Sequence, residues 1–491
     1  MLNPTGMLVV VPSRLAVGEP FAVKVKLRGA VQEIPAAGAW CTVKPRLRGP
    51  FNFNAQRNIQ YLDDSLPEWT GTLAVEADDL DGPRMLSFDG RSQGVFPGDI
   101  RAIKTFDGLR FTRPGIHFLK LVDGAGGLAA WSNPVMVSEP PPHDRIWWGD
   151  PHWQTFFSDG IRCPEELYAF ARDEAFLDFG AISDHMEALT ARQWDYFQAV
   201  TNDFNAPGRF ATLQGQEWTH HVPAGGAPGH RNVYFRGAGG PLLRCTDPDC
   251  DTLAKLWARL DALPPGEALA IPHHTSNVVM GVDWAQGWNP TYEKAVEIYS
   301  IWGSSERPAA DGNPRPIRAL KGEKPGRHVV DALQRGYRLG FVAGGDIHDG
   351  RPGDELHAHQ NRVGDYAGTL HPQGFTAAIA PALSREAVFD AMASRRTYAT
   401  TKRRVYLDVT TGGAGGSSQL HVHAASEDGV CEAVLVRGGE DADRRRPDDD
   451  PRIVRADFRL LDLGPSEFCY VRVLTDTGDM AWSSPIWGDR P

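Results

Sequence analysis

The chain has 491 residues, of which 41% are hydrophobic and 23% are charged, a balance that is ordinary for a folded protein of roughly two to four domains. Its net charge of -11 and isoelectric point near 5.8 argue against nucleic acid as a partner, because a phosphate backbone attracts a basic surface. Residues 1–6 lack the basic start and long apolar stretch of a signal peptide, and no later run nears the roughly 18 apolar residues that a membrane span needs. We therefore predict a cytoplasmic protein with no membrane partner.

The cysteines do not form the pattern of a disulfide framework, because there are only six in this length and most lie far apart. Cys245 and Cys250, in Cys-Thr-Asp-Pro-Asp-Cys, could form a local disulfide or half of a zinc site. A structural zinc site needs about four ligands and no second cysteine pair follows, so two unpaired thiols are favoured.

Residues 1–140 carry short runs in which apolar and polar residues alternate, such as residues 21–27 and 118–122, separated by Gly, Pro and Asp. This pattern predicts an N-terminal antiparallel β-sandwich of immunoglobulin-like type. The proline-rich segment 138–144 is stiff and unable to continue a sheet, so a domain boundary is expected there.

Residues 145–400 alternate apolar strands with amphipathic helices. Thr252 caps one predicted helix, in which Leu256 and Leu260 share a face, and Ser384 begins another. Strand candidates end near seven residues: His152, Asp184, Glu217, Phe235, His274, Ser300 and His348. Strands interleaved with helices in this way predict a barrel of parallel β/α units.

From residue 401 to residue 491 the alternation of apolar and polar residues returns, which predicts a C-terminal β-rich domain. Its Ala-Trp-Ser motif at 481–483 repeats the one at 130–132, so the flanking regions are either related sandwiches or share an edge-strand turn. The predicted fold class is α/β, with a (β/α)7 barrel flanked by β-sandwich-like regions. The sandwiches are expected to border the barrel or to join copies of the chain into a homo-oligomer.

Residue types that bind metals follow the predicted strands of the middle region in an ordered series. The series comprises Gly-Asp-Pro-His-Trp-Gln-Thr (149–155), Ser-Asp-Gly (158–160), Ser-Asp-His (183–185), Gly-Gln-Glu (215–217), Gly-His (229–230), Pro-His-His (272–274) and Gly-Asp-Ile-His (345–348). Each motif alone is explained by a turn, a salt bridge or a strand cap. Together they favour a metal-dependent hydrolase, because the carboxyl ends of barrel strands converge and imidazoles with carboxylates suit zinc, manganese or iron.

The series resembles the motifs of the polymerase and histidinol phosphatase (PHP) superfamily. Those motifs run Asp-x-His-x-His-Thr-x-x-Ser-Asp-Gly, Thr-Asp-His, Gly-x-Glu, separate histidines and Gly-Ser-Asp-x-His. More narrowly, the chain resembles an uncharacterised PHP-like family that begins Gly-Asp-Leu-His-x-Gln and carries Arg-Arg-x-Tyr-Ala-Thr-Thr, here residues 395–401. The closing segment 481–487 also resembles the end of that family.

The resemblance implies a distorted seven-stranded barrel that binds up to three divalent ions. By position, the ligands would be His152, Gln154, Glu217 and Asp346 for a first ion, Glu217, His230 and His273 for a second, and Asp159, His185 and His348 for a third. Asp150 and Asp184 would orient neighbouring imidazoles. We expect two to three ions of manganese, zinc or iron.

Gln154 departs from the superfamily pattern, which has a histidine at this position. Because an amide oxygen is a poorer zinc ligand than an imidazole, the first ion should bind more weakly, prefer a harder metal such as manganese, or be absent. His274 could compensate, but the alternation of side chains along a strand would point it away from the site.

The expected reaction is hydrolysis of a phosphomonoester or phosphodiester by a hydroxide bridging two ions, with His185 or His348 protonating the leaving group. Arg351 is the favoured residue for binding an anionic substrate, and Arg307, Arg395 and Arg396 are further candidates. Aromatic residues near the motifs favour a small substrate with an apolar or aromatic part. They are Trp148, Trp153, Phe156, Phe157, Trp218, Tyr299 and Trp302.

The sequence alone leaves two alternatives to phosphoester hydrolysis. The same ions would serve hydrolysis of a carboxylic ester, an amide or a lactone. A non-catalytic module, in which the sandwiches bind carbohydrate or protein beside an inert barrel, predicts broken metal motifs. Eight of the nine ligand positions keep a metal-binding residue type, which argues against this second alternative.

Overall fold

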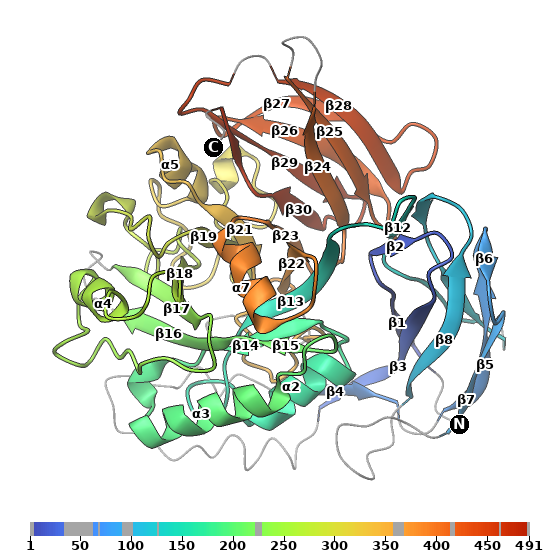
Figure 1. The fold of residues 1–491 in the computed structure, drawn as a ribbon, viewed down its shortest axis with the longest axis horizontal. Coiled ribbons are helices and arrows are strands. Elements are labelled where there is room, and N and C mark those ends of the chain that lie inside the picture. The colour runs from blue at the N-terminus through green and yellow to red at the C-terminus, as the bar shows by residue number, and fades with distance from the viewer. Residues whose placement is uncertain are drawn as a thin grey trace.

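The computed structural model describes residues 4–33, 62–66, 69–90, 102–124, 127–220, 228–356, 368–412, 418–460 and 463–488. Figure 1 shows the N-terminal strands in blue on one side, the C-terminal strands in red above, and the middle region beside both. None of the helices in these ranges is long and apolar enough to cross a membrane. Cys245 and Cys250 are both free thiols, as are the other described cysteines, Cys163, Cys431 and Cys469.

The N-terminal region consists of small, mostly antiparallel sheets around one core, with β2 and β12 as a parallel pair. The first contains β1 (Gly6–Val10), β3 (Phe21–Glu33), β4 (Leu62–Ser65), β6 (Leu80–Asp81) and β8 (Ile103–Phe111). The second contains β5 (Thr70–Glu76), β7 (Met85–Asp89), β10 (Lys120–Asp123) and β11 (Ala129–Trp131), and a third contains β2 (Arg14–Ala16), β9 (Gly115–His117) and β12 (Val135–Ser138). Val25, Leu73 and Leu121 are fully buried between the first two sheets, because alternate residues of each strand face inward. Lys26 is also buried, although it lies on the opposite face of β3.

The largest sheet joins the middle region to the C-terminal strands. Its order is β15 (Ala211–Thr212), β14 (Phe179–Ile182), β13 (Arg145–Trp153), β22 (Gly374–Ala380), β23 (Thr397–Thr401), β30 (Met480–Ser483), β29 (Phe468–Thr475), β26 (Val430–Arg437) and β27 (Glu440–Arg445), with β31 (Ile486–Trp487) paired to β29. A separate sheet holds β24 (Tyr406–Gly412), β25 (Ser418–Ala425) and β28 (Ile453–Leu460). The C-terminal strands therefore continue the sheet that contains β13, through the pairing of β23 with β30.

Two small sheets complete the middle region. One is antiparallel and holds β16 (Gln214–His220), β17 (Gly229–Phe235) and β18 (Ala268–Pro272). The other pairs β19 (Ala295–Ser300) parallel to β21 (Gly340–Ala343) and antiparallel to β20 (Gly303–Ser304). Each small sheet presents one end to the candidate site.

The helices of the described residues are α2 (Pro164–Asp173), α3 (Ala191–Phe204), α4 (Leu253–Leu260), α5 (Val329–Gln334) and α7 (Arg385–Ala393). Short 3-10 turns are η2 (Met186–Ala188), η3 (Trp284–Gln286) and η4 (Ala309–Asp311). The predicted starts of α4 and α7 are confirmed: Thr252 and Ser384 accept hydrogen bonds from Lys255 N and Ala387 N, at 3.3 Å and 3.1 Å. Leu256 and Leu260 of α4 are buried, as their shared face predicts.

The predicted (β/α)7 barrel is wrong. The described structure is 42% strand and 13% helix, with five helices and several sheets. Among the described strands of the middle region, only β13 with β14, β14 with β15, and β19 with β21 pair in parallel, and isolated parallel bridges join Trp153 to Ile347 and His185 to Glu217. The physical reason is visible between β16 and β17, which only residues 221–228 connect. A parallel crossover takes about a dozen residues or more, so these two strands form an antiparallel pair.

The repeated Ala-Trp-Ser motif takes the same place in two hairpins. Trp131 of β11 pairs with Lys120 of β10, and Trp482 of β30 pairs with Arg472 of β29. The two tryptophans differ in burial, since Trp131 is 40% exposed and Trp482 is fully buried.

Glu306 anchors the C-terminal strands to the middle region. Its buried carboxylate accepts hydrogen bonds from Tyr470 Oη at 2.6 Å, Arg472 Nη1 at 2.7 Å and Trp482 Nε1 at 2.8 Å. Burial alone would raise the pKa of Glu306, but Arg472 and Arg307 hold it below its usual range. The carboxylate is therefore charged and compensated.

We expect Glu306→Ala to lower the free energy of unfolding by about 3–5 kcal/mol, because it leaves the buried Tyr470 hydroxyl and Trp482 N–H without their acceptor and Arg472 with Asp441 as its remaining carboxylate partner. The measurement is urea denaturation followed by circular dichroism. Asp457→Asn is the control, because it removes an exposed pair with His421 and should change stability little. Equal effects of the two substitutions would contradict the anchoring role of Glu306.

Candidate metal centre

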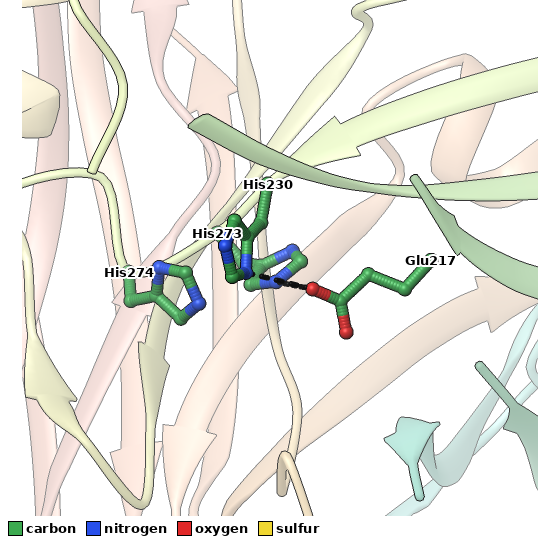
Figure 2. Close-up of side chains that lie close together, drawn as sticks. All are labelled: Glu217, His230, His273 and His274. Atoms are coloured by element: carbon green, nitrogen blue, oxygen red, sulfur yellow. Dashed lines mark hydrogen bonds and ion pairs between the residues drawn. The ribbon is translucent and has the colours of Figure 1, made fainter. Parts of the chain in front are cut away.

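Glu217, near the end of β16, is a buried carboxylate that imidazoles approach from several sides. Its Oε1 lies 2.8 Å from His230 Nδ1 and 3.1 Å from His273 Nε2. Figure 2 shows His230, His273 and His274 gathered on one side of this carboxylate. The hairpin explains the approach of His230: in the register of β16 and β17, Thr219 pairs with His230, so His230 is a diagonal neighbour of Glu217 on the same face.

The second oxygen of Glu217 faces another set of nitrogens. Oε2 accepts a hydrogen bond from Gln154 Nε2 at 2.8 Å and lies 3.4 Å from His185 Nδ1 and 3.6 Å from His152 Nε2. Burial alone would raise the pKa of Glu217, but the imidazoles of His185 and His273 hold it well below its usual range. The carboxylate is thus ionised, with one oxygen directed at each set.

Three groupings of side chains each bring one possible ligand atom per residue to within 4.8 Å of one another. The bridge grouping is Glu217, His230, His273 and His274, the inner grouping is His152, His273 and Asp346, and the outer grouping is Asp159, His185 and His348. The bridge and inner groupings are buried, whereas the outer grouping is half-buried. Eight of the nine ligands predicted from the sequence belong to these groupings, and the ninth, Gln154, does not.

The position of His274 differs from the expectation that strand alternation would point it away. β18 ends at Pro272, and His274 has a φ of 33°, in the left-handed region that residues other than glycine seldom adopt. The alternation therefore stops before these histidines. The rings of His273 and His274 lie with their centroids 4.3 Å apart, and the His274 ring lies 4.7 Å from that of His230.

Gln154 lies beside Glu217 but outside the three groupings. Its Nε2 donates to Glu217, and its Oε1 accepts from Ser158 Oγ at 2.9 Å. In the inner grouping His273 accompanies His152 and Asp346, where the sequence resemblance implied Gln154. The amide of Gln154 thus contacts the carboxylate that was predicted to bridge two ions.

Asp346 follows β21 in a left-handed conformation, with a φ of 51°. Its Oδ1 lies 3.3 Å from His152 Nε2, and its Oδ2 accepts a hydrogen bond from Trp302 Nε1. Such a conformation is unfavourable for an aspartate and persists where its surroundings fix the backbone, as they often do at functional sites. Trp302 therefore both packs beside the centre and orients one of its carboxylates.

Glu297 is a supporting residue that the motif analysis missed. It is buried in β19, and its Oε2 lies 3.0 Å from His152 Nδ1. Glu297 accepts a hydrogen bond from Nδ1–H, so Nε2, which faces Glu217 and Asp346, is the nitrogen that could bind a cation after losing its proton. Burial alone would lower the pKa of His152, but Asp346 and Glu297 raise it well above its usual range, so a bound cation would take the place of that proton. A glutamate inside the apolar strand Ala-Val-Glu-Ile was the signal available in the sequence.

Asp150 and Asp184 support the backbone around the centre. Asp150 Oδ1 accepts from His152 N at 3.1 Å and from Gly345 N at 2.7 Å, which ties the end of β13 to the loop after β21. Asp184 accepts from the backbone and the hydroxyl groups of Thr155 and Ser158, and so orders the loop that leads to Asp159. Burial raises the pKa of Asp184 to about 6. These carboxylates orient chain segments, whereas the prediction was that they orient imidazoles.

The outer grouping requires positive charge. His185 and His348 direct Nε2 at Asp159 Oδ2, at 3.5 Å and 3.2 Å, while Nδ1 of each ring contacts Thr219 Oγ1 and Asp346 O, respectively, at 2.6 Å. Burial alone would lower the pKa of His348, but Asp159 raises it to about 9. Conversely, His348 and His185 hold the pKa of Asp159 well below its usual range, against the effect of burial. A proton or a metal cation can supply the charge that this arrangement favours.

The chemistry of the donor set fits divalent ions. Within the described residues, His152 Nε2, His273 Nδ1 and His274 Nδ1 are buried and make no hydrogen bond. Buried polar atoms are normally paired, because the loss of hydration is otherwise uncompensated. Imidazole nitrogens that converge with carboxylate oxygens are the usual ligands of zinc, manganese and iron.

The arginines predicted to bind an anionic substrate are engaged elsewhere. Arg351 is 1% exposed and pairs with Asp64 of the N-terminal sheet, which does not agree with a role in substrate binding. Arg307 pairs with Asp441 at 2.8 Å and Arg396 with Asp144 at 2.6 Å, and Arg395 lies over the ring of Trp487 at 5.6 Å.

We expect Glu297→Gln to weaken metal binding about 10–100-fold, because the amide no longer holds the His152 proton on Nδ1 as a charged acceptor does. Metal content after dialysis against a graded chelator, with circular dichroism to verify folding, measures this effect. Glu432→Gln, in β26, is the control, because Glu432 pairs with Arg444 and contacts no ligand. Unchanged metal affinity in Glu297→Gln would contradict the role of Glu297.

We expect His274→Ala to lower metal affinity as well, since His274 offers a ligand atom to the bridge grouping. Cobalt titration followed by visible absorption should show a changed spectrum, because the number of nitrogen ligands falls. His421→Ala removes an exposed histidine and is the matched control. A wild-type spectrum in His274→Ala would mean that His274 is not a ligand.

Comparison with known proteins gives a family but no named activity. Residues 160–297 and 333–454 match the family described as "Protein of unknown function (DUF3604)". An uncharacterized protein of Chlamydia muridarum is 29% identical over 409 residues, and one of Chlamydia trachomatis serovar D is 29% identical over 411 residues. Each alignment covers 78% of this chain, which spans 63% of the length of either relative.

One solved structure in the comparison comes from Bacteroides vulgatus and is described as a two-domain protein containing a predicted PHP-like metal-dependent phosphoesterase. It is 15% identical, with a TM-score of 0.34, and the match covers 68% of this chain and 91% of that one. The matched family segments include His185, Glu217, His230, His273 and His348. Because these segments make up more than half of the sequence, the chain belongs to the DUF3604 family.

Proposed function

We propose that the chain is a metal-dependent hydrolase of phosphoesters, either monoesters or diesters. The observation that supports this most is the ionised carboxylate of Glu217, which directs one oxygen at His230 and His273 and the other at His152 and His185. A carboxylate in this position would hold two cations side by side. When bound, neighbouring divalent ions lower the pKa of water to near neutrality and offset negative charge on phosphoryl oxygens.

The chain's own residues would divide the remaining work. Glu297 holds His152 in place, and Trp302 holds Asp346. Asp150 fixes the loop at Gly345, which precedes Asp346. His185 and His348 are the half-buried imidazoles of the centre, so they are the candidates to deliver a proton to the leaving oxygen. The outer grouping is then the side from which a substrate arrives.

We further propose that the substrate is a small anionic molecule with an apolar or aromatic part. Phe156, three residues before Asp159, is 42% exposed and stacks on Phe157 with ring centroids 4.3 Å apart. Trp302 packs edge-on to His348, with ring centroids 6.3 Å apart. An exposed ring beside a polar centre provides a surface on which a flat apolar group can stack.

The test combines elemental analysis of protein purified without added metal with a substrate screen. The screen uses p-nitrophenyl phosphate, bis-p-nitrophenyl phosphate and a p-nitrophenyl carboxylic ester, with manganese or zinc added. We expect at least one bound ion per chain and turnover of a phosphoester. Glu217→Ala should lose metal and reduce turnover at least about 100-fold, since a direct ligand should matter no less than its supporting residues.

Glu432→Ala is the matched control and should keep both metal and turnover, because it lies in β26 and pairs with Arg444. Turnover of the carboxylic ester alone would replace the phosphoester proposal with hydrolysis of a carboxylic ester, amide or lactone. Less than one ion per chain, with no turnover after manganese or zinc is added, would refute the hydrolase and favour a binding module.

A further inference from the structure

The loop that carries His348 is attached on its other side to the N-terminal sheet. Arg351 lies three residues after His348, and its Nη2 donates to Asp64 Oδ1 of β4. Its Nη1 lies 3.4 Å from Asp63 Oδ1, and its Nε donates to the backbone oxygen of Asp354 at 3.0 Å. Figure 1 shows β4 reaching from the N-terminal strands toward α2 in the middle region.

Further charges join the same contact, which we call the interface cluster: Lys26, Arg28, Asp64, Glu174, Arg351 and Asp354. Lys26 Nζ lies 2.9 Å from Asp354 Oδ2 and 3.2 Å from Glu174 Oε2. Arg28 pairs with Asp354 and lies 3.6 Å from Asp64 Oδ2. All of these residues except Arg28 are at most 3% exposed.

The cluster makes the two regions depend on each other. A buried charge is strongly unfavourable without its partner. Lys26 and Arg28 of the N-terminal strand β3 pair with Asp354, and Lys26 also pairs with Glu174, both in the middle region. In the opposite sense, Arg351 of the middle region pairs with Asp64 of the N-terminal sheet. The ring of Phe170 in α2 lies 4.9 Å from both Lys26 Nζ and the Arg351 guanidinium, which adds a cation–π contact on each side. The N-terminal sheet therefore fixes the place of Arg351.

The chain between Arg351 and the ligands has little freedom to absorb a displacement. Ile347 N donates to His152 O at 3.2 Å, and Gln154 N donates to Ile347 O at 2.9 Å, so the segment is tied to β13 just before His348. Just after it, Asp349 accepts from Arg351 N at 3.1 Å and from Leu356 N at 2.9 Å. His348 is held between an anchor on the sheet of β13 and an anchor on the N-terminal sheet.

We propose that Arg351 and Asp64 are positioning residues for His348, so that the N-terminal sheet sets the geometry of the outer grouping. The proposal rests on the proposed metal centre and goes beyond it, because it gives the N-terminal region a part in metal binding. It also gives Arg351 a role different from the predicted one, which was to bind the substrate. The guanidinium acts through the backbone of the loop and contacts Asp63, Asp64 and the backbone oxygen of Asp354.

The test is cobalt titration of the full chain carrying Asp64→Asn, followed by visible absorption and by elemental analysis. We expect one ion to bind about 10–100-fold more weakly than in the wild type while the others keep their affinity, because only the outer grouping contains His348. A thermal melt by circular dichroism establishes that the variant is folded at the assay temperature. A purely structural role would lower the melting temperature without weakening one ion selectively.

Asp408→Asn is the matched control. Asp408 pairs with Arg14 at 2.8 Å and so also joins an N-terminal strand to a later one, but the pair contacts no ligand-bearing loop. All ions should bind to this variant as to the wild type. If Asp64→Asn does not fold, Arg28→Gln takes its place in the test, because Arg28 is the half-buried member of the interface cluster. This substitution should weaken the binding of the same ion, by a smaller factor.

Wild-type affinity for every ion in the folded variant would overturn this proposal and leave the metal centre intact. An equal loss of all ions would also overturn it, since the effect would then be general. A wild-type chain that binds less than one ion would overturn both this proposal and the proposed function, so the two failures are distinct.

Discussion

The buried negative charge of Glu217 is the constraint around which the middle region is arranged. A carboxylate at 1% exposure must be surrounded by groups that compensate it, and five nitrogens from four segments of the chain do so. His152 and Gln154 come from the end of β13 and the residues after it, His185 follows β14, His230 begins β17 and His273 follows β18. The ends of separate sheets therefore have to meet at one carboxylate.

A mostly antiparallel fold brings these residues together by a different route from the predicted barrel. In a parallel barrel His230 would lie at the opposite end from Glu217, because it begins its strand while Glu217 is near the end of its own. The hairpin of β16 and β17 reverses the direction and returns His230 to the same end. The side chains predicted as ligands therefore lie close together, although the strand directions inferred from the sequence were wrong. Their role as metal ligands stays a prediction.

The parts of the site that were not predicted depend on backbone geometry or on contacts distant in sequence. His274 reaches the bridge grouping because of its left-handed φ, and the period of two in a strand carries no sign of that. Glu297 belongs to an apolar strand without a motif, and only its contact with His152 reveals its role. Arg351 was assigned by its closeness to His348 in the sequence, whereas its partner Asp64 lies in another region of the chain. In contrast, the caps of α4 and α7 and the apolar face of α4 are local and were predicted correctly.

The continuity of the large sheet bears on how the chain folds during synthesis. β13 carries His152, but it reaches the C-terminal strands only through β22, β23 and then β30, which the ribosome makes much later. Until β30 arrives, the edge of β23 has unpaired backbone groups, and Trp482 is absent from the core that it shares with Tyr299 and Ala399. Sheets with pairings so distant in sequence form slowly, and such exposed edges are sites of aggregation. Until β30 is made, the edge of β23 is therefore a place where a chaperone that covers strand edges would protect the nascent chain.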